Sequence, residues 1–316
     1  CNPVIEEAAT RILEITGLNE GKCEFLCSGS EAVEFCVRMA GELMPGKKFL
    51  TFSDSYFGAY GEATRHDSKD WIRFNWQTCS CNAPGDGCRA ECDEFAMIPF
   101  DQVGVFLFEP GSSSGLVNFP SEKLISAIID RIRENNGIVI INEITTGVGR
   151  TGKWFGFQHY NIIPDMVAIG KGIGNGYPVS VAAVSERMVR LAENNPFHYS
   201  QSHQNDPLGA SVVKEVIDTI IDENLLERGR RLGEKIMREL EKLQAQNTAV
   251  KEIRGRGLMI AIEFNRDAKI IQHELLRRGF IAAKRSGKNV LRIDPALTID
   301  EKDTDAFVKT LAEILQ

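Results

Sequence analysis

The chain has 316 residues, of which 43% are hydrophobic and 26% are charged, a composition typical of a soluble globular protein. The formal net charge of −7 argues against a nucleic-acid-binding protein, which would carry a basic face. No apolar run approaches the roughly 20 residues that a transmembrane helix needs, and no signal peptide opens the chain. We therefore expect a cytoplasmic protein that binds neither nucleic acid nor a membrane.

Short apolar runs alternate with amphipathic stretches, a pattern typical of an α/β protein with a mainly parallel sheet. Continuous apolar runs predict strands that are buried on both faces, and the intervening stretches predict helices. In chain order we predict a helix over 31–43, a strand over 48–52, a strand over 103–108, a helix over 122–135, and strands over 137–141 and 166–169.

The last third of the chain changes in character. It begins with a long helical pattern over 208–246 that is interrupted near Asn224. Two short strands, 258–264 and 289–293, and a final helix over 300–315 follow. We therefore predict a large domain over residues 1–214 and a smaller C-terminal domain over residues 215–316.

Polar side chains follow the predicted strands at the points where the strands end. Glu109 follows the second strand, Asn142 the third and Lys171 the fourth, and Ser28 opens a helix directly after an earlier apolar run. Because ligands of open α/β sheets bind beyond the carboxyl ends of the strands, we expect these groups to converge on one edge.

Each of these motifs also has an ordinary structural explanation. Ser28 and Glu31 form an S-x-x-E capping box, which starts a helix and nothing more unless an anion binds its free N–H groups. Lys171 lies in a glycine-rich turn that does not match the nucleotide P-loop, and a solvated loop lysine is its simplest interpretation. The combination of a lysine, acids and a helix N-terminus at one edge is what indicates a site.

All eight cysteines lie within the first 92 residues, unlike the even spread in a small disulfide-rich secreted protein. Four of them, Cys79, Cys81, Cys88 and Cys92, are crowded around a Pro/Gly-rich loop at residues 82–87. Four thiolates at this density predict a structural zinc ion or an iron–sulfur cluster. Their spacing matches no standard pair of CxxC motifs, so reduced loop thiols and a disulfide remain alternatives.

Residues 137–185 read GIVIINEITTGVGRTGKWFGFQHYNIIPDMVAIGKGIGNGYPVSVAAVS. This segment resembles the hallmark of class III aminotransferases, in which a strand is followed by D-E-V-Q-T-G, G-R-T-G, P-D and a G-K-x-x-x-x-G-x-P lysine motif. Further matches occur in the family's order at 28–32, 56–58, 109–110, 206–208 and Arg292. The resemblance implies the fold type I of pyridoxal-phosphate (PLP) dependent transferases, with a mainly parallel central sheet flanked by helices and a smaller α+β C-terminal domain.

The resemblance also implies residue roles. Lys171 would hold PLP as a Schiff base and then carry protons once substrate displaces it. Arg292 would grip a substrate carboxylate through a bidentate pair. The other cofactor contacts would come from five places. The helix-opening turn would supply Ser28, with Gly29 and Ser30 at the phosphate, and the aromatic turn would supply Tyr56, stacked on the ring, with Phe57. Glu109 would lie near the cofactor's phenolic edge with Thr145, which replaces the usual glutamine, Asn142 would face the pyridine nitrogen, and Ser202 would reach the phosphate bound by the neighbouring subunit.

Three features depart from the family pattern. Asn142 stands where the family has an aspartate that keeps the pyridine nitrogen protonated, so we expect weaker transamination or a reaction that relies less on the ring as an electron sink. The chain begins at Cys1 without the segment that usually precedes its first helix, so we expect a chain shortened at that end. Ser114 replaces a glutamate that often pairs with the carboxylate-binding arginine, so we expect Arg292 to be permanently available.

We predict a homodimeric PLP-dependent aminotransferase that moves an amino group between an amino acid or amine donor and a keto acid. Two alternatives remain open. One is a PLP enzyme of the same fold with another reaction, such as a racemase or an aminomutase. The other is a PLP-binding chain with little or no activity, because of Asn142 and the missing segment.

Overall fold

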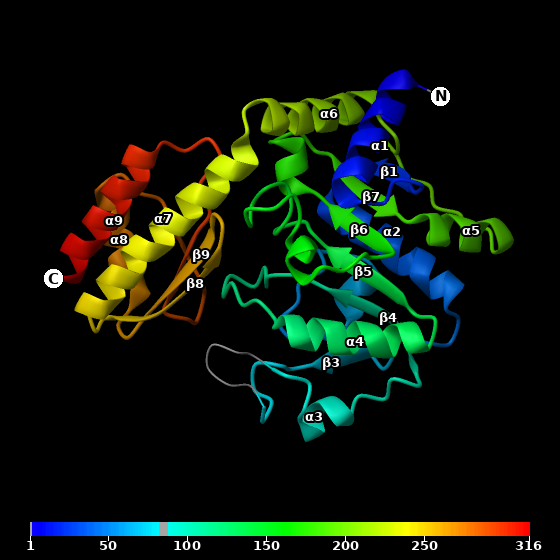
Figure 1. Cartoon of the computed structure of the whole chain (residues 1–316), viewed down its shortest axis with the longest axis horizontal. Coiled ribbons are helices and arrows are strands. Elements are labelled where there is room, and N and C mark those ends of the chain that lie inside the picture. The colour runs from blue at the N-terminus through cyan, green and yellow to red at the C-terminus, as the bar shows by residue number, and fades with distance from the viewer. Residues whose placement is uncertain (1, 82–87) are drawn as a thin grey trace. The chain divides into compact units, whose positions relative to one another are not determined.

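The computed structural model describes residues 2–81 and 88–316 (Figure 1). The chain forms two compact units, each with its own hydrophobic core. The first unit comprises Cys1–Gly111, Phe119–Val148 and Phe155–Thr219. The second comprises Ile220–Gln316 together with two short segments from earlier in the chain, Ser112–Asn118 and Gly149–Trp154.

The first unit contains most of the regular elements, and the last of them, α6, ends three residues beyond this unit. In chain order they are α1 (Pro3–Thr16), β1 (Lys22–Leu26), α2 (Gly29–Leu43), β2 (Lys48–Phe52), η1 (Glu62–Arg65), β3 (Trp71–Phe74), α3 (Asp93–Ala96), β4 (Val103–Phe108), α4 (Glu122–Glu134), β5 (Ile138–Asn142), η2 (Gly156–Tyr160), β6 (Met166–Ile169), η3 (Lys171–Gly174), β7 (Ser180–Val184), α5 (Glu186–Asn194) and α6 (Pro207–Asp222). The predicted strands β2, β4 and β6 are confirmed to the residue, and β5 begins and ends one residue later than predicted.

The seven strands form one sheet in the order β1-β7-β6-β5-β4-β2-β3. The pairs from β6 to β3 are parallel, whereas β7 is antiparallel to both of its neighbours. The prediction of an α/β fold with a mainly parallel sheet is therefore confirmed. Because the parallel strands share one direction, their carboxyl ends lie along the same edge of the sheet.

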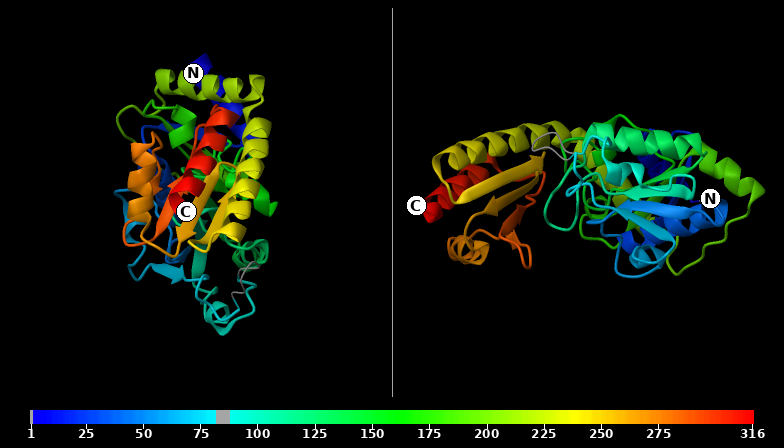
Figure 2. Two further views of the ribbon diagram at one scale, coloured as in Figure 1. Left: turned by 90° about the vertical axis from the view of Figure 1, so that its left-hand side faces the viewer. Right: turned by 90° about the horizontal axis from the view of Figure 1, so that it is seen from below.

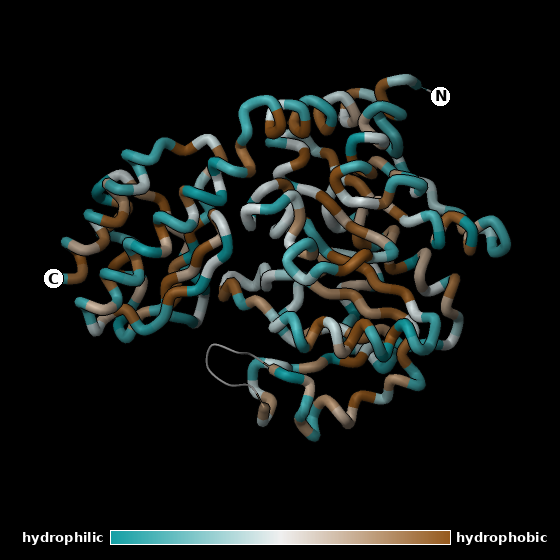
Figure 3. Tube along the Cα trace, viewed as in Figure 1, coloured by the Kyte–Doolittle hydropathy of each residue, from teal (hydrophilic) through white to brown (hydrophobic). Residues whose placement is uncertain are grey.

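Helices cover both faces of this sheet, with α4 in front of the strands and α2 behind them in Figure 1. Successive residues of a strand point to opposite faces, so Val105 and Leu107 of β4 share one core cluster with Val33 and Ala40 of α2. Both faces are buried, and the strands accordingly form the hydrophobic centre of the unit in Figure 3. This explains why their sequences are continuous apolar runs rather than alternating ones.

The second unit is built on a smaller antiparallel sheet of order β10-β11-β9-β8. The long helix α7 lies alongside β8 and α9 and can be followed in yellow in Figure 2. Asn224, with a left-handed φ of 50°, separates α6 from α7 where the interruption was predicted. The elements are α7 (Leu225–Gln246), β8 (Val250–Arg256), β9 (Met259–Phe264), α8 (Ala268–Arg277), β10 (Ala283–Lys284), β11 (Val290–Ile293) and α9 (Glu301–Leu315). Within residues 2–81 and 88–316, no helix is both long and apolar enough to cross a membrane.

Candidate active site

Asn142 ends β5 and connects three segments through its side-chain amide. Its Nδ2 donates to the carbonyl oxygen of Tyr56 at 3.0 Å and to Oε1 of Glu109 at 3.4 Å. Its Oδ1 accepts from the backbone N–H of Ile144 at 3.1 Å. Glu109, which follows β4, in turn accepts from the backbone N–H of Tyr56 at 2.9 Å. The residues that follow β4 and β5 therefore lie together, as predicted. Both polar atoms of the Asn142 amide, Nδ2 and Oδ1, already have hydrogen-bond partners within the protein.

Lys171 follows β6 in a turn that holds its backbone in the left-handed region, with φ 45°. A residue with a Cβ atom uncommonly adopts this backbone conformation, because it costs about 1–2 kcal/mol. The Lys171 amine is exposed, and its Nζ donates to Oγ1 of Thr145 at 3.1 Å. The turn thus presents a primary amine next to a hydroxyl at the end of the central strands.

The start of α2 lies against this turn. A Cβ atom on Gly29 would come within 2.9 Å of Ile144, and one on Gly170 would meet the same side chain at 2.9 Å. Ser28 caps the helix, since its Oγ accepts from the N–H of Glu31 at 3.3 Å and the Glu31 side chain bonds back to the cap. The N–H groups of a helix's first turn have no intrahelical acceptor, so this end of α2 is suited to an anion.

The loop after β2 closes the other side of this helix start. The backbone N–H of Ala59 donates to Ser30 Oγ at 3.0 Å, and the Tyr60 hydroxyl lies 3.3 Å from Ser28 Oγ. Partial burial raises the pKa of Tyr60. Tyr56 is 54% exposed, whereas Phe57 is fully buried in the core next to Trp71, so only the tyrosine ring is available to a ligand. Tyr60 was not predicted from the sequence, although it belongs to the same aromatic turn.

Glu143 anchors the loop after β5 from inside the protein. Its Oε2 accepts from Thr146 Oγ1 at 2.6 Å and from the N–H of Gly156 at 2.9 Å, and its Oε1 accepts from the N–H of Phe157 at 2.7 Å. Burial raises the pKa of the Glu143 carboxyl to about 7, although these three hydrogen bonds lower it. The carboxyl points into the protein, so its role is to hold the loop that carries Thr145.

Two predicted site residues lie outside this network. Ser202 is exposed in the turn before α6. Arg292 lies on β11 in the second unit, where Nε is 2.6 Å from Oδ2 of Asp294 and Nη2 donates to Oδ1 at 3.0 Å. The expectation that Arg292 is permanently available is therefore wrong. Residues two apart in an extended chain point to the same side, and this spacing in R-I-D was the signal that could have revealed the ion pair.

The four clustered cysteines come together as the sequence suggested. Their Sγ atoms all lie within 4.8 Å of one another, and each thiol is unlinked. Burial acts to raise the pKa of Cys81, but hydrogen bonds from the backbone of Glu91 and Arg89 and from the Cys92 and Cys88 thiols lower it to about 6. Residues 82–87, which include the predicted Pro/Gly-rich loop, lie outside the described residues.

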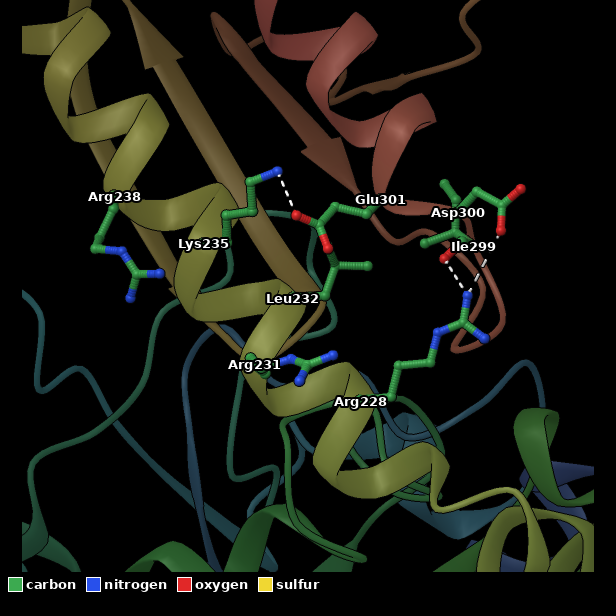
Figure 4. A pocket seen from close by; sticks show the side chains of 8 residues that line it. All are labelled: Arg228, Arg231, Leu232, Lys235, Arg238, Ile299, Asp300 and Glu301. Atoms are coloured by element: carbon green, nitrogen blue, oxygen red, sulfur yellow. Dashed lines mark hydrogen bonds and ion pairs between the residues drawn. The ribbon is translucent and has the colours of Figure 1, made fainter.

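A basic cavity of about 450 Å³ lies in the second unit (Figure 4). Lys235 pairs with Glu301 at 2.7 Å, and Arg228 donates to the carbonyl oxygen of Ile299 at 2.7 Å. The cavity contains none of the predicted site residues, and two of its cations already have protein partners. Its lining residues are Arg228, Arg231, Leu232, Lys235, Arg238, Ile299, Asp300 and Glu301.

Comparison with known proteins gives consistent results. Residues 2–315 match the family model described as Aminotransferase class-III. Ornithine aminotransferase 1 of Staphylococcus aureus (strain MRSA252) is 33% identical over 215 residues, which cover 68% of this chain and 53% of that protein. Leucine/methionine racemase of Thermococcus litoralis is 27% identical over 329 residues, which cover 94% of this chain and 73% of that protein.

A transaminase from the marine bacterium Virgibacillus has a similar structure, with a TM-score of 0.88 and 23% identity over 100% of this chain and 79% of that chain. This likeness confirms the predicted fold type. The chain spans about half the length of the Staphylococcus relative that it matches.

Proposed function

Because the chain belongs to the class III aminotransferase family, we propose that it binds PLP and transfers an amino group between an amino acid or amine donor and a keto acid. One observation carries this proposal. The amine of Lys171 is presented in a left-handed turn, 3.1 Å from Thr145 Oγ1, and the adjoining Gly170 lies against the same isoleucine side chain as the first residue of α2. The turn that carries the amine and the start of α2 are thus held side by side.

The residues present fit the cofactor. The first-turn N–H groups of Gly29 and Ser30 would hold its phosphate, and the exposed ring of Tyr56 would stack on its pyridine. The Lys171 amine would bind its aldehyde as a Schiff base. When bound, PLP supplies an electron sink that allows a bond to the amino carbon to break.

Lys171 would serve two functions in turn. Its amine would hold the cofactor, and once an incoming amine took that place, Nζ would be the group that takes and returns a proton at the substrate carbon. Thr145 accepts a hydrogen bond from Nζ and so limits the directions in which the amine can point.

Asn142 and Glu109 would determine how strongly the site favours a charged ring. The Asn142 amide carries no charge, and its oxygen already accepts from Ile144. The nearest carboxylate, Glu109, accepts from the Asn142 amide and from the backbone of Tyr56. We therefore expect a slower amino transfer than an aspartate at position 142 would support.

Racemisation is the second candidate. The 27% identity to a leucine/methionine racemase over 94% of this chain favours it, and so does the uncharged Asn142. A racemase returns a proton to either face of the carbon from which one was taken, whereas an aminotransferase releases the carbon skeleton as a keto acid. With L-leucine or L-ornithine as donor, keto-acid release indicates transfer, and D-amino acid without keto acid indicates racemisation.

An absorption spectrum of the purified chain with added PLP tests the cofactor proposal. We expect a borohydride-reducible band near about 410–430 nm in the unmutated chain. The band should be absent in Lys171→Ala and unchanged in Lys69→Ala, which removes an exposed lysine elsewhere in the first unit. An equal band in Lys171→Ala, or no band in the unmutated chain, would overturn the proposal.

A further inference from the structure

Four cysteine sulfurs gather in the connection between the edge strand β3 and β4. Cys81 Sγ lies 3.5 Å from Cys88 Sγ and 4.0 Å from Cys79 Sγ. Together with Cys92 Sγ these make four sulfurs, which all lie within 4.8 Å of one another. A tetrahedral zinc ion with Zn–S bonds of about 2.3 Å places its sulfurs about 3.8 Å apart. We propose that these four thiolates bind one structural zinc ion, independently of the PLP site.

The spacing favours a single ion over the two alternatives for four neighbouring thiols. A disulfide joins its sulfurs at about 2.05 Å, much closer than the 3.5 Å between Cys81 and Cys88. An iron–sulfur cluster places several irons and sulfides between the thiolates and would hold the sulfurs farther apart than a single shared ion does. One tetrahedral ion fits the observed distances without movement of the backbone.

Backbone N–H groups point at the sulfurs, as expected around anionic ligands. The N–H of Arg89 donates to Cys81 Sγ at 3.4 Å, and the N–H of Ala90 donates to Cys88 Sγ at 3.5 Å. Ala90 has a left-handed φ of 61°, an unusual conformation for a residue with a Cβ atom. These outer contacts orient the thiolates and offset part of their negative charge.

The surroundings indicate a structural rather than a catalytic ion. Cys79, Cys88 and Cys92 are buried, so four protein ligands would close the site to water and substrate. The connection from Phe74 to Val103 is far longer than the roughly 15 residues beyond which loops are uncommon, and in its described part only α3 is helical. A metal ion would add to the few buried apolar side chains of this segment, Trp76, Ile98 and Phe100.

Neighbouring hydrogen bonds fasten the cluster to the rest of the first unit. Ser121, which caps α4, donates to the carbonyl oxygen of Cys88. Ser80, between two of the ligands, donates to Glu94 of α3 at 2.8 Å. Zinc binding would therefore order a segment that contacts both α3 and the start of α4.

The test is metal analysis of the full chain, purified under reducing conditions without a metal-affinity step. We expect one zinc per chain by mass spectrometry, and loss of the zinc with a lower melting temperature in Cys81→Ser/Cys88→Ser. Cys23→Ser, which alters a thiol of β1 outside the cluster, should keep the full zinc content. Cobalt added to the zinc-free chain should give the thiolate charge-transfer bands of a tetrahedral site, and the double variant should not.

Several results would overturn the proposal. These are less than about one tenth of an equivalent of zinc, equal zinc in the double variant, iron with acid-labile sulfide, or cysteines found as disulfides after alkylation of the native chain. None of these readouts uses PLP or turnover, so failure of the proposed enzymatic function would leave this test unaffected.

Discussion

Asn142 donates to Tyr56 and Glu109 and accepts from Ile144, so its amide satisfies three hydrogen-bonding groups in a buried position. An aspartate in its place could not donate to either acceptor and would put a second carboxylate beside Glu109. The residue therefore links local stability to the chemistry of the site: an amide suits the protein partners, whereas a carboxylate would suit a protonated ring.

Asn142→Asp should separate these two effects. Without PLP, we expect the variant to lose about 1–3 kcal/mol in its free energy of unfolding at neutral pH, because buried acceptors lose their donor. With PLP, amino transfer should become faster by on the order of tenfold, because the carboxylate stabilises a charged ring. Urea unfolding and single-turnover kinetics measure the two effects. Asn19→Asp, in an exposed turn, should change neither, and a slower transfer in Asn142→Asp would contradict the role given to this position.

Glu143 predicts a pH dependence of stability. Burial raises its pKa in the folded chain from 4.5 to about 7, so between these values the folded chain retains a proton that the unfolded chain has lost. The free energy of unfolding should therefore fall as the pH rises through this window, by about 1.4 kcal/mol per unit of pKa shift, and be level above it. Glu143→Gln cannot titrate, so its unfolding free energy should change less between pH 5 and pH 8. Equal slopes in the two proteins would refute this assignment, and Glu193→Gln, an exposed carboxyl, is the control.

Among the elements, α2 begins with a side-chain cap whose two partners, Ser28 and Glu31, lie three residues apart in the sequence. Ser28 Oγ accepts from the N–H of Glu31, and the carbonyl oxygen of Ser28 accepts from Ser180 Oγ at 2.7 Å, which ties the helix start to β7. The N-terminal serine of α5, Ser185, makes no side-chain cap bond in the described structure. The two N-cap serines thus allow a direct comparison between a helix with a side-chain cap and one without.

Ser28→Ala should lower the free energy of unfolding by about 1 kcal/mol, because a first-turn N–H loses its acceptor. Ser185→Ala should leave it within about 0.5 kcal/mol of the unmutated chain, because no cap bond is lost. Chemical denaturation of the PLP-free chain compares the two. Equal losses of unfolding free energy in the two variants would show that the hydrogen bond of the Ser28 cap does not stabilise the chain.

At the scale of the whole molecule, the exposed position of Ser202 is consistent with a role toward a second copy of the chain. We expect light scattering to give twice the chain mass of 35.1 kDa. Ser202→Ala should keep this mass but bind PLP about tenfold more weakly or worse, because a hydrogen bond to a charged phosphate is lost. Ser200→Ala, two residues away and also exposed, should bind PLP normally. A monomer, or unchanged PLP affinity in Ser202→Ala, would refute the predicted intersubunit contact.

The sequence by itself determined several buried strands of this protein and the family to which it belongs. Apolar runs define β2, β4 and β6 to the residue, and the spacing around Lys171 is specific enough to indicate the family. Both signals are local, since periodicity and turn chemistry depend on neighbours along the chain.

Only the tertiary structure decided which side chains satisfy one another. It revealed that Asn142 donates to Tyr56, that Asp294 neutralises Arg292, and that segments 112–118 and 149–154 belong to the second unit. These outcomes depend on packing between residues distant in the chain, or on the direction in which a side chain leaves its strand. Neither composition nor periodicity encodes them, because a buried polar group is satisfied by whatever donor or acceptor the fold brings within reach.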